Sequence, residues 1–178
     1  MEMNTNFYYR ALLLLFVSSM REPLHLCGAD PTDGFTRVPL TEENFVLQKP
    51  YDGYDYTSGV WQFEGYAFVP KGTSGATIVQ ILGGAQSATT LQLRIYNGDI
   101  RYYSSKLVAT DLYNKWFRVN IIHDVGNGKV RVFISGTQKY EGNDSGWEGY
   151  FKFGVYAAPA ESSDYMESSW KWIKLYKK

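Results

Sequence analysis

The stretch "TTLQLRIYNGDIRYY", residues 89–103, predicts a β-hairpin. Leucine or isoleucine stands at every second position from Leu91 to Ile95, which is the pattern of a strand with one buried face. Asn97-Gly98 follows, and this pair favours a tight two-residue turn because both residues tolerate positive φ angles. The stretch therefore predicts two antiparallel strands.

The same pattern recurs along most of the chain. Short alternating segments are separated by polar or Gly-rich turns, and no stretch has the 3.6-residue periodicity of an amphipathic helix. The expected strands lie at 61–70, 77–82, 89–96, 99–103, 116–125, 129–135, 137–142, 150–156 and 168–176. Antiparallel strands without helices predict a jelly-roll β-sandwich, and 178 residues suit one domain.

The N-terminus is predicted to be a signal peptide. A basic residue precedes the apolar run 11–17, which is too short to span a bilayer. Cys27 and Ala29 are small residues at the spacing that signal peptidase requires. We expect cleavage after Ala29, which divides the chain into a leader, 1–29, and a mature domain, 30–178. The mature domain is expected to enter the secretory pathway and to reach either the extracellular space and cell wall or the vacuole. An ordinary buried helix is the alternative.

Cleavage removes most of the metal-binding side chains. Cys27 is the only cysteine, and His123 is the only histidine that remains in the mature domain. Disulfides and zinc sites built on Cys or several His are therefore excluded, and we expect no metal and no cofactor. The formal net charge is zero, which gives no electrostatic argument for nucleic acid or an acidic membrane as a partner. We expect a monomer.

Candidate chemistry is limited. No Gly-x-Ser-x-Gly motif occurs, and His123 alternates in phase with apolar residues, which places it on the core face. A glycosidase needs two facing carboxylates, and the sequence cannot place Glu64 opposite Glu141. Asn143-Asp144-Ser145 is a candidate N-glycosylation site at Asn143.

The stretch "YFKFGVY", residues 150–156, carries polar side chains on one predicted face. Tyr150, Lys152 and Tyr156 alternate with an apolar stripe, and Gly154 leaves a gap between them. This face either lines a groove for a polymer or a small anion, or is an ordinary solvated surface. β-Elimination on a uronic-acid polymer needs a group that neutralises a carboxylate, with a base and an acid. The residues that supply part of that set are Lys152, Arg94, Gln80 and Tyr156.

Two of these segments resemble a known family. "TIVQILGG", 77–84, and "YFKFGVY" look like the two later signature strands of the alginate-lyase-like jelly rolls, polysaccharide lyase family seven. The segments 29–52, 53–75, 116–125 and 150–157 are also similar to the plant citrate-binding protein group, a branch of that fold. The resemblance implies a concanavalin-like two-sheet jelly roll with a concave face. It also implies a role in citrate binding, whereas the lyase relatives cleave uronate polymers on that face.

The resemblance carries over to individual positions. Gln80 matches the amide that holds the substrate carboxylate, and Tyr156 matches the catalytic acid, or acid and base. Leu82 stands where the family has its catalytic histidine, and Ala158 stands where the second signature ends in glutamine. Because leucine cannot move a proton, elimination by the histidine route is not available.

The resemblance also predicts an internal gap. In the family an early strand carries Arg-Thr-Glu-(Ile/Val/Leu)-Arg, but here "LQKPYD" runs directly into "GYDYTSG" at Asp52–Gly53. A splice form, a gene-model error and a real deletion all remain open. The loss of early strands exposes the edges of neighbouring strands.

Three functions follow from these observations. The first is a non-catalytic binding protein for citrate or a similar polycarboxylate. The second is a polysaccharide lyase or carbohydrate-binding module for uronate-containing cell-wall polysaccharide, with Tyr156 and Gln80 as catalytic residues. The third is a jelly roll without a ligand. The predicted ligand-binding residues are Gln80, Arg94, Tyr150, Lys152 and Tyr156.

Overall fold

The computed structural model describes residues 29–41, 44, 56–83, 89–144, 149–158 and 162–178. These parts of the chain contain no α-helix. They therefore contain no helix that could cross a membrane. The strands are β1 (Thr36–Val38), β2 (Val60–Phe68), β3 (Ala76–Gly83), β4 (Thr89–Tyr96), β5 (Asp99–Tyr102), β6 (Lys106–Ala109), β7 (Trp116–Asp124), β8 (Lys129–Ile134), β9 (Thr137–Asn143), β10 (Gly149–Ala157) and β11 (Ser169–Lys177). The all-β prediction is confirmed.

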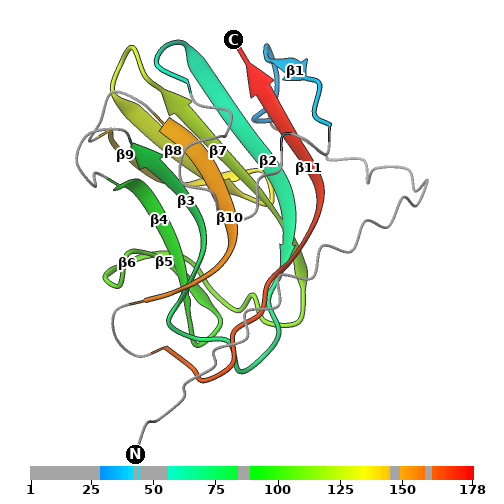
Figure 1. Ribbon diagram of the computed structural model, residues 1–178, viewed down its shortest axis with the longest axis vertical. Helices are drawn as coiled ribbons and strands as arrows, with labels where there is room; N and C mark the ends of the chain where they lie inside the picture. The colour runs from blue at the N-terminus through cyan, green and yellow to red at the C-terminus, as the bar shows by residue number, and fades with distance from the viewer. Residues whose placement is uncertain (1–28, 42–43, 45–55, 84–88, 145–148, 159–161) are drawn as a thin grey trace, which may run out of the picture.

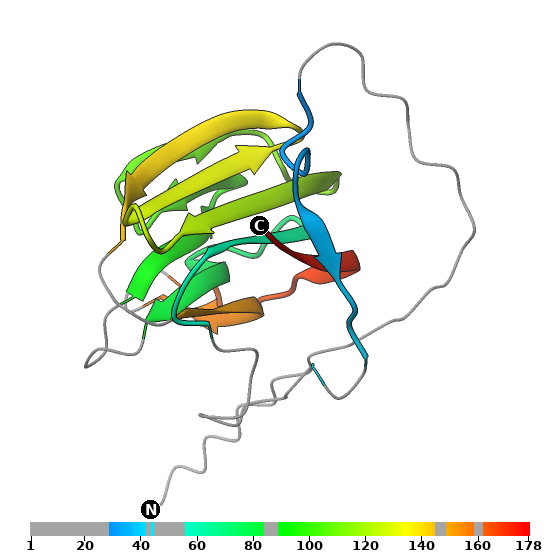
Figure 2. The ribbon, with the colours of Figure 1, turned by 90° about the horizontal axis from the view of Figure 1, so that it is seen from above.

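The strands form two antiparallel sheets that pack as a sandwich. One sheet has six strands in the order β1-β11-β2-β7-β8-β9, and the other has five in the order β10-β3-β4-β5-β6. Figure 1 shows β11 between β1 and β2, and Figure 2 shows the layers from above. Strand β10 stands at one end of its sheet in the part of the chain that the structure describes.

The predicted hairpin is present as β4 and β5. Tyr96 pairs with Asp99 across the turn, and both turn residues have positive φ, 52° at Asn97 and 88° at Gly98. A Cβ atom at Gly98 would also lie 2.9 Å from the ring of Tyr113. Glycine is therefore required here both for its backbone conformation and for the close approach of an aromatic ring.

All nine expected strands are observed, and two further strands were missed. Strands β1 and β6 have only three and four residues, and most of their side chains are exposed or half-exposed. Short strands with little buried surface lack the apolar alternation that sequence analysis depends on. They form because the edges of β11 and β5 supply hydrogen-bonding partners.

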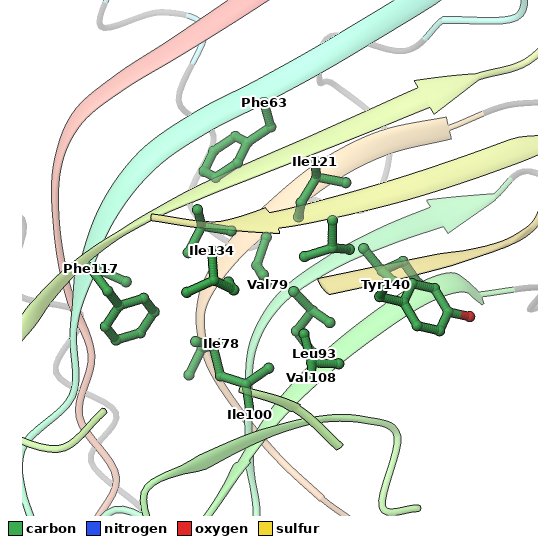
Figure 3. Packing of buried hydrophobic residues seen from close by; sticks show 14 of the residues in the cluster. Phe63, Ile78, Val79, Leu93, Ile100, Val108, Phe117, Ile121, Ile134 and Tyr140 are labelled. Carbon is green, nitrogen blue, oxygen red and sulfur yellow. The ribbon is translucent and has the colours of Figure 1, made fainter. Parts of the chain in front are cut away.

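The core lies between the two sheets. Figure 3 shows Val79 and Leu93 of the five-stranded sheet in the same cluster as Ile121 and Ile134 of the six-stranded sheet. Full burial of a leucine or isoleucine contributes about 1.5–3 kcal/mol, so this layer is the main source of stability. The alternation that fills the core also decides which side chains face outward.

Asp30, where the mature chain is predicted to begin, is attached to the six-stranded sheet. Its Oδ2 atom lies 2.8 Å from Nη1 of Arg118 on β7. Its Oδ1 atom accepts hydrogen bonds from the backbone N and the Oγ1 of Thr32, at 3.0 and 2.7 Å. Burial opposes ionisation, but the hydrogen bonds from Thr32 and the charge of Arg118 outweigh it and hold the pKa of Asp30 below its usual value. The folded state therefore favours the carboxylate.

Asp30→Asn is expected to lower the free energy of unfolding at neutral pH by less than about 1 kcal/mol, because the ion pair is partly exposed. The folded-state pKa lies below the unfolded value, so this stabilisation is present above about pH 3.9 and is lost as the pH falls through the folded value. Urea unfolding at about pH 7 and about pH 3 measures it, with Asp164→Asn as an exposed control. A difference between variant and wild type that grows at the lower pH would contradict this assignment.

Candidate functional site

The predicted ligand-binding residues lie on three neighbouring strands of the five-stranded sheet. They are Gln80 on β3, Arg94 on β4, and Tyr150, Lys152 and Tyr156 on β10. Both β10 and β4 pair with β3. Because Val79, Ile81 and Leu93 belong to the core cluster, the side chains that alternate with them point away from the core. The structure therefore brings all five onto the outer face of one sheet.

The register of the strands arranges the outward side chains of β10, β3 and β4 in two rows. The first row is Lys152, Gln80 and Gln92, and the second row is Tyr156, Thr77 and Arg94. Directly opposed side chains have Cβ atoms about 4.5–5.5 Å apart, so each row is a line of contacting groups. We name the six residues of these rows the polar face.

Bulges in two ladders set the register of the second row. Between Thr77 and Val79, β3 has one more residue than β4, and between Phe153 and Tyr156, β10 has one more residue than β3. Gly154 lies within the second bulge at φ 130°, a conformation that residues with a Cβ rarely adopt. The glycine in "YFKFGVY" thus permits the bulge that keeps Tyr156 opposite β3 on the outer side.

Arg94 is the most enclosed charge of the polar face. Its side chain is held by two hydrogen bonds, from Nε to Oγ1 of Thr77 at 3.2 Å and from Nη2 to Oε1 of Gln92 at 2.5 Å. Its guanidinium carbon lies 5.4 Å from the ring centroid of Tyr103, and the residue is 8% exposed. Among the residues that the structure describes, no carboxylate forms an ion pair with it. The sheet therefore presents a fixed, nearly buried cation without a counter-ion.

The side chains from β10 are more accessible. Lys152 is exposed and forms no ion pair within the described ranges, whereas Tyr150 is half-buried. Tyr156 is 62% exposed. Gln80, opposite Lys152, is buried at the centre of the first row. The polar face thus combines an enclosed guanidinium with an exposed ammonium and an accessible phenol.

Three contact residues of Arg94 were missed as site residues, namely Thr77, Gln92 and Tyr103. Alternation had placed Gln92 on the same face as Arg94, so its part in the site could have been inferred. Tyr103 could not, because it follows β5 with a positive φ of 52°, which strand periodicity does not predict. Burial, and to a lesser degree Tyr102, raises the pKa of Tyr103, so its phenol stays protonated and donates to the carbonyl oxygen of Thr89.

Leu82 lies on the same outer side, opposite Tyr150, and is half-buried. An isobutyl group there can neither accept a proton from a sugar carbon nor stabilise a developing negative charge. His123 does not replace it, because His123 is 1% exposed on the core side of β7. The prediction that His123 faces the core is confirmed.

His123 belongs to a buried network that links the sheets. Its Nδ1 lies 2.8 Å from the hydroxyl of Tyr56, and its Nε2 lies 2.8 Å from Oδ2 of Asp144. Thr90 on β4 donates to the other carboxylate oxygen at 2.8 Å. Burial, followed by the charge of Asp144, raises the pKa of Tyr56 well above its usual range. A protonated phenol donates to Nδ1 of His123, and the Nε2–H group donates to Asp144. We name these four residues the inter-sheet network.

Other candidate sites add little. Within the described ranges, no group of three His, Cys, Asp or Glu side chains could hold a metal ion. Asn143 is exposed at the end of β9 and accepts a hydrogen bond from Lys129, but Ser145 of its glycosylation motif lies outside the described residues.

Comparison with known proteins agrees with this architecture. A family model described as alginate lyase matches residues 34–177. The chain belongs to the alginate lyase family. A protein from Hevea brasiliensis, named citrate-binding protein, is 52% identical over 206 residues, which cover 93% of this chain and 86% of that protein.

The Hevea relative also supports the predicted internal gap. The match uses 93% of 178 residues, which is about 166, whereas the alignment has 206 positions. About 40 positions of the alignment therefore have a residue only in the relative. The proposed junction at Asp52–Gly53 itself lies outside the described residues.

Solved alginate lyases share the fold at low identity. The enzyme from Corynebacterium sp. has a TM-score of 0.53 and 18% identity over 70% of this chain and 63% of that chain. The enzyme from Pseudomonas aeruginosa has a TM-score of 0.51 and 17% identity over 71% of this chain and 69% of that chain. A family 7 alginate lyase solved with its substrate has a TM-score of 0.53 and 15% identity over 67% of this chain and 62% of that chain. This chain spans less than two thirds of the first and third of these lyases, and the likeness is one of fold.

Proposed function

We propose that this chain binds citrate or a similar polycarboxylate on the polar face and does not convert it. The observation that carries the proposal is the guanidinium of Arg94, which is enclosed, fixed by Thr77 and Gln92, and without a carboxylate partner among the described residues. An enclosed charge without a counter-ion is costly, and an anionic ligand reduces that cost. Charge-assisted hydrogen bonds to carboxylates are also stronger than neutral ones.

The arrangement of the other polar residues favours a ligand with several carboxylates. Lys152 and Arg94 stand two strands apart and in different rows, so their Cα atoms are about 12 Å from each other, and their long side chains can converge on one small molecule. Gln80 lies between them and offers an amide to the ligand. The relative named citrate-binding protein supports citrate as the first ligand to test.

A uronate polymer is the second candidate ligand. Tyr156 is exposed beside Lys152 on β10, in a chain of the alginate lyase family, so a sugar carboxylate could reach the same cations. Turnover is disfavoured because Leu82 occupies the position at which a proton-transfer residue is expected. We therefore favour binding over cleavage for either ligand.

Citrate is expected to raise the thermal unfolding temperature of residues 30–178. At a free concentration about a hundredfold above the dissociation constant, a ligand that binds only the folded state stabilises it by about 2.7 kcal/mol, which corresponds to a rise of several degrees. Acetate at matched ionic strength is the control, because a single carboxylate cannot contact both cations. An equal shift with acetate, or none with citrate, would contradict the proposal.

The same preparation distinguishes binding from cleavage. Elimination on an oligouronate forms an unsaturated sugar that absorbs in the ultraviolet. We expect no increase in absorbance during long incubation of the protein with oligogalacturonate or oligoguluronate. A steady increase that Tyr156→Phe abolishes would establish a lyase instead.

A further inference from the structure

A second surface lies on the opposite sheet, away from the polar face. Its residues come from the adjoining ends of β2, β7 and β11, and they are Tyr66, Phe68, Trp116, Lys171 and Trp172. Phe68 pairs with Trp116, and Tyr66 pairs with Lys171, so these positions are neighbours in the sheet. We name this set the tryptophan patch.

The patch exposes two large aromatic side chains. Trp116 is 44% exposed and Trp172 is 38% exposed. Their rings do not lie isolated on the surface, because Tyr66 supports Trp172 at 5.0 Å between ring centroids and Phe68 supports Trp116 at 5.5 Å. Tryptophan is highly buried on average, so a pair of supported, exposed indoles on one sheet face points to a binding surface.

A bulge in β11 brings Trp172 to this face. Trp170 and Ile173 both pack against the core, although they are three residues apart. The register shift between Lys171 and Lys174 accounts for this spacing, because it leaves two successive residues on the outer side. In a regular strand, Trp172 and Trp170 would share one face. The bulge therefore turns one indole outward.

Trp172 also has an unusual backbone conformation. Its φ angle is 53°, in the left-handed region that bulky residues rarely occupy. Such a conformation is strained for a residue with a Cβ, and strained residues cluster at functional sites. Asparagine or glycine would meet the backbone requirement at lower cost, so the tryptophan is not explained by the bulge alone.

Lys171 places a positive charge between the two indoles. Its Nζ lies 4.1 Å from the ring centroid of Trp116 and 4.4 Å from that of Trp172. No carboxylate among the described residues forms an ion pair with it. The neighbouring Arg118 is already paired with Asp30. The patch therefore presents one unneutralised cation flanked by two aromatic rings.

We propose that the tryptophan patch binds an acidic oligosaccharide, separately from the polar face. A pyranose ring has an apolar C–H face that can stack on an exposed indole while its hydroxyl groups remain hydrated at the edge. A hexuronate adds a carboxylate, which pairs with the ammonium of Lys171. The chain's zero net charge offers no comparable support for nucleic acid. Since the two surfaces lie on different sheets, this proposal does not rest on the proposed function.

The direct test is a titration with a galacturonic acid trimer, followed by the indole N–H signals in two-dimensional NMR spectra. We expect the signals of Trp116 and Trp172 to shift with the trimer, while that of the buried Trp61 stays unchanged. Cellotriose, a neutral trimer, is expected to bind at least about tenfold more weakly because it cannot pair with Lys171. Equal affinity for the neutral trimer would overturn the acidic assignment.

Variants separate a binding role from a structural one. Trp116→Ala and Trp172→Asn are each expected to weaken trimer binding by about tenfold or more, and asparagine tolerates the left-handed backbone at 172. Lys171→Gln should lower the affinity for the acidic trimer by about tenfold and leave the affinity for cellotriose unchanged. Tyr165→Ala, which removes an exposed aromatic ring elsewhere, is the matched control.

The proposals for the two surfaces can be contradicted independently. A variant with Arg94→Ala and Lys152→Ala is expected to lose citrate binding and to keep the trimer-induced shifts of the two indoles. If those shifts vanish in that variant, the trimer binds at the polar face and the proposal is wrong. Absence of any indole shift in the wild type, or full affinity in both tryptophan variants, would also overturn it.

Discussion

Replacement of both Arg94 and Lys152 by alanine is expected to weaken citrate binding by at least about a hundredfold. Each substitution removes a charge-assisted hydrogen bond of about 1.5–3 kcal/mol, and about 2.7 kcal/mol already corresponds to a hundredfold change in affinity. Calorimetric titration of wild type and variant measures the loss. The circular dichroism spectrum should stay unchanged, because both side chains point away from the core.

A matched control separates this site from the general effect of charge. Arg37→Ala with Lys139→Ala removes the same charge from exposed positions on the six-stranded sheet, and citrate affinity should stay within about twofold of the wild type. Arg94→Lys is informative as a single change, because it keeps the charge but cannot reproduce two fixed hydrogen bonds together with stacking on Tyr103. Citrate affinity that survives the double alanine variant would place the site elsewhere.

The two faces of the strands could be predicted because side chains alternate. This rule alone placed Lys152 and Tyr156 on one side of β10, and it placed Gln80 and Arg94 among the polar positions of their own strands. It could not predict which residues are opposite each other. That depends on the bulges at Thr77–Val79 and Phe153–Tyr156, each of which moves one strand by a residue relative to its neighbour.

Contacts that depend on unusual backbone angles could not be predicted from the sequence. Tyr103 stacks on Arg94 and Trp172 faces outward, and each residue has a positive φ that is rare for aromatic side chains. Sequence rules assign such angles to glycine or asparagine, and they succeeded at Asn97-Gly98 for that reason. The unexpected angles occur at both surfaces for which we propose a ligand, where local strain is offset by the surrounding fold.

His123 shows the same limit for the interior. Its alternation with apolar residues predicted a core position, but its partners are 67 and 21 residues away in the sequence. In the sequence, Asp144 is the middle residue of a candidate glycosylation motif. The structure shows instead that this carboxylate joins β7 to β4 through His123 and Thr90. Long-range polar pairs of this kind have no local signal in a single sequence.

Asp144→Ala is therefore expected to lower the free energy of unfolding by about 2–4 kcal/mol. The change leaves the Nε2–H of His123 and the hydroxyl of Thr90 without their acceptor, and each unsatisfied buried donor costs about 1–3 kcal/mol. Tyr56 cannot compensate, because it already occupies the other ring nitrogen of His123. Urea unfolding followed by tryptophan fluorescence measures the difference.

Two comparisons decide whether the inter-sheet network is the cause of the Asp144→Ala effect. Asp144→Asn keeps an acceptor oxygen, so it should be less destabilising than alanine, while Asp164→Ala on the surface should change the free energy of unfolding by less than about 0.5 kcal/mol. In a His123→Phe background, Asp144→Ala should lower the free energy of unfolding by less than it does in the wild type. The reason is that one of the two donors left without an acceptor, the Nε2–H of His123, is already absent. If the costs at Asp144 and His123 simply add, the two residues do not act as one unit and the network does not link the sheets energetically.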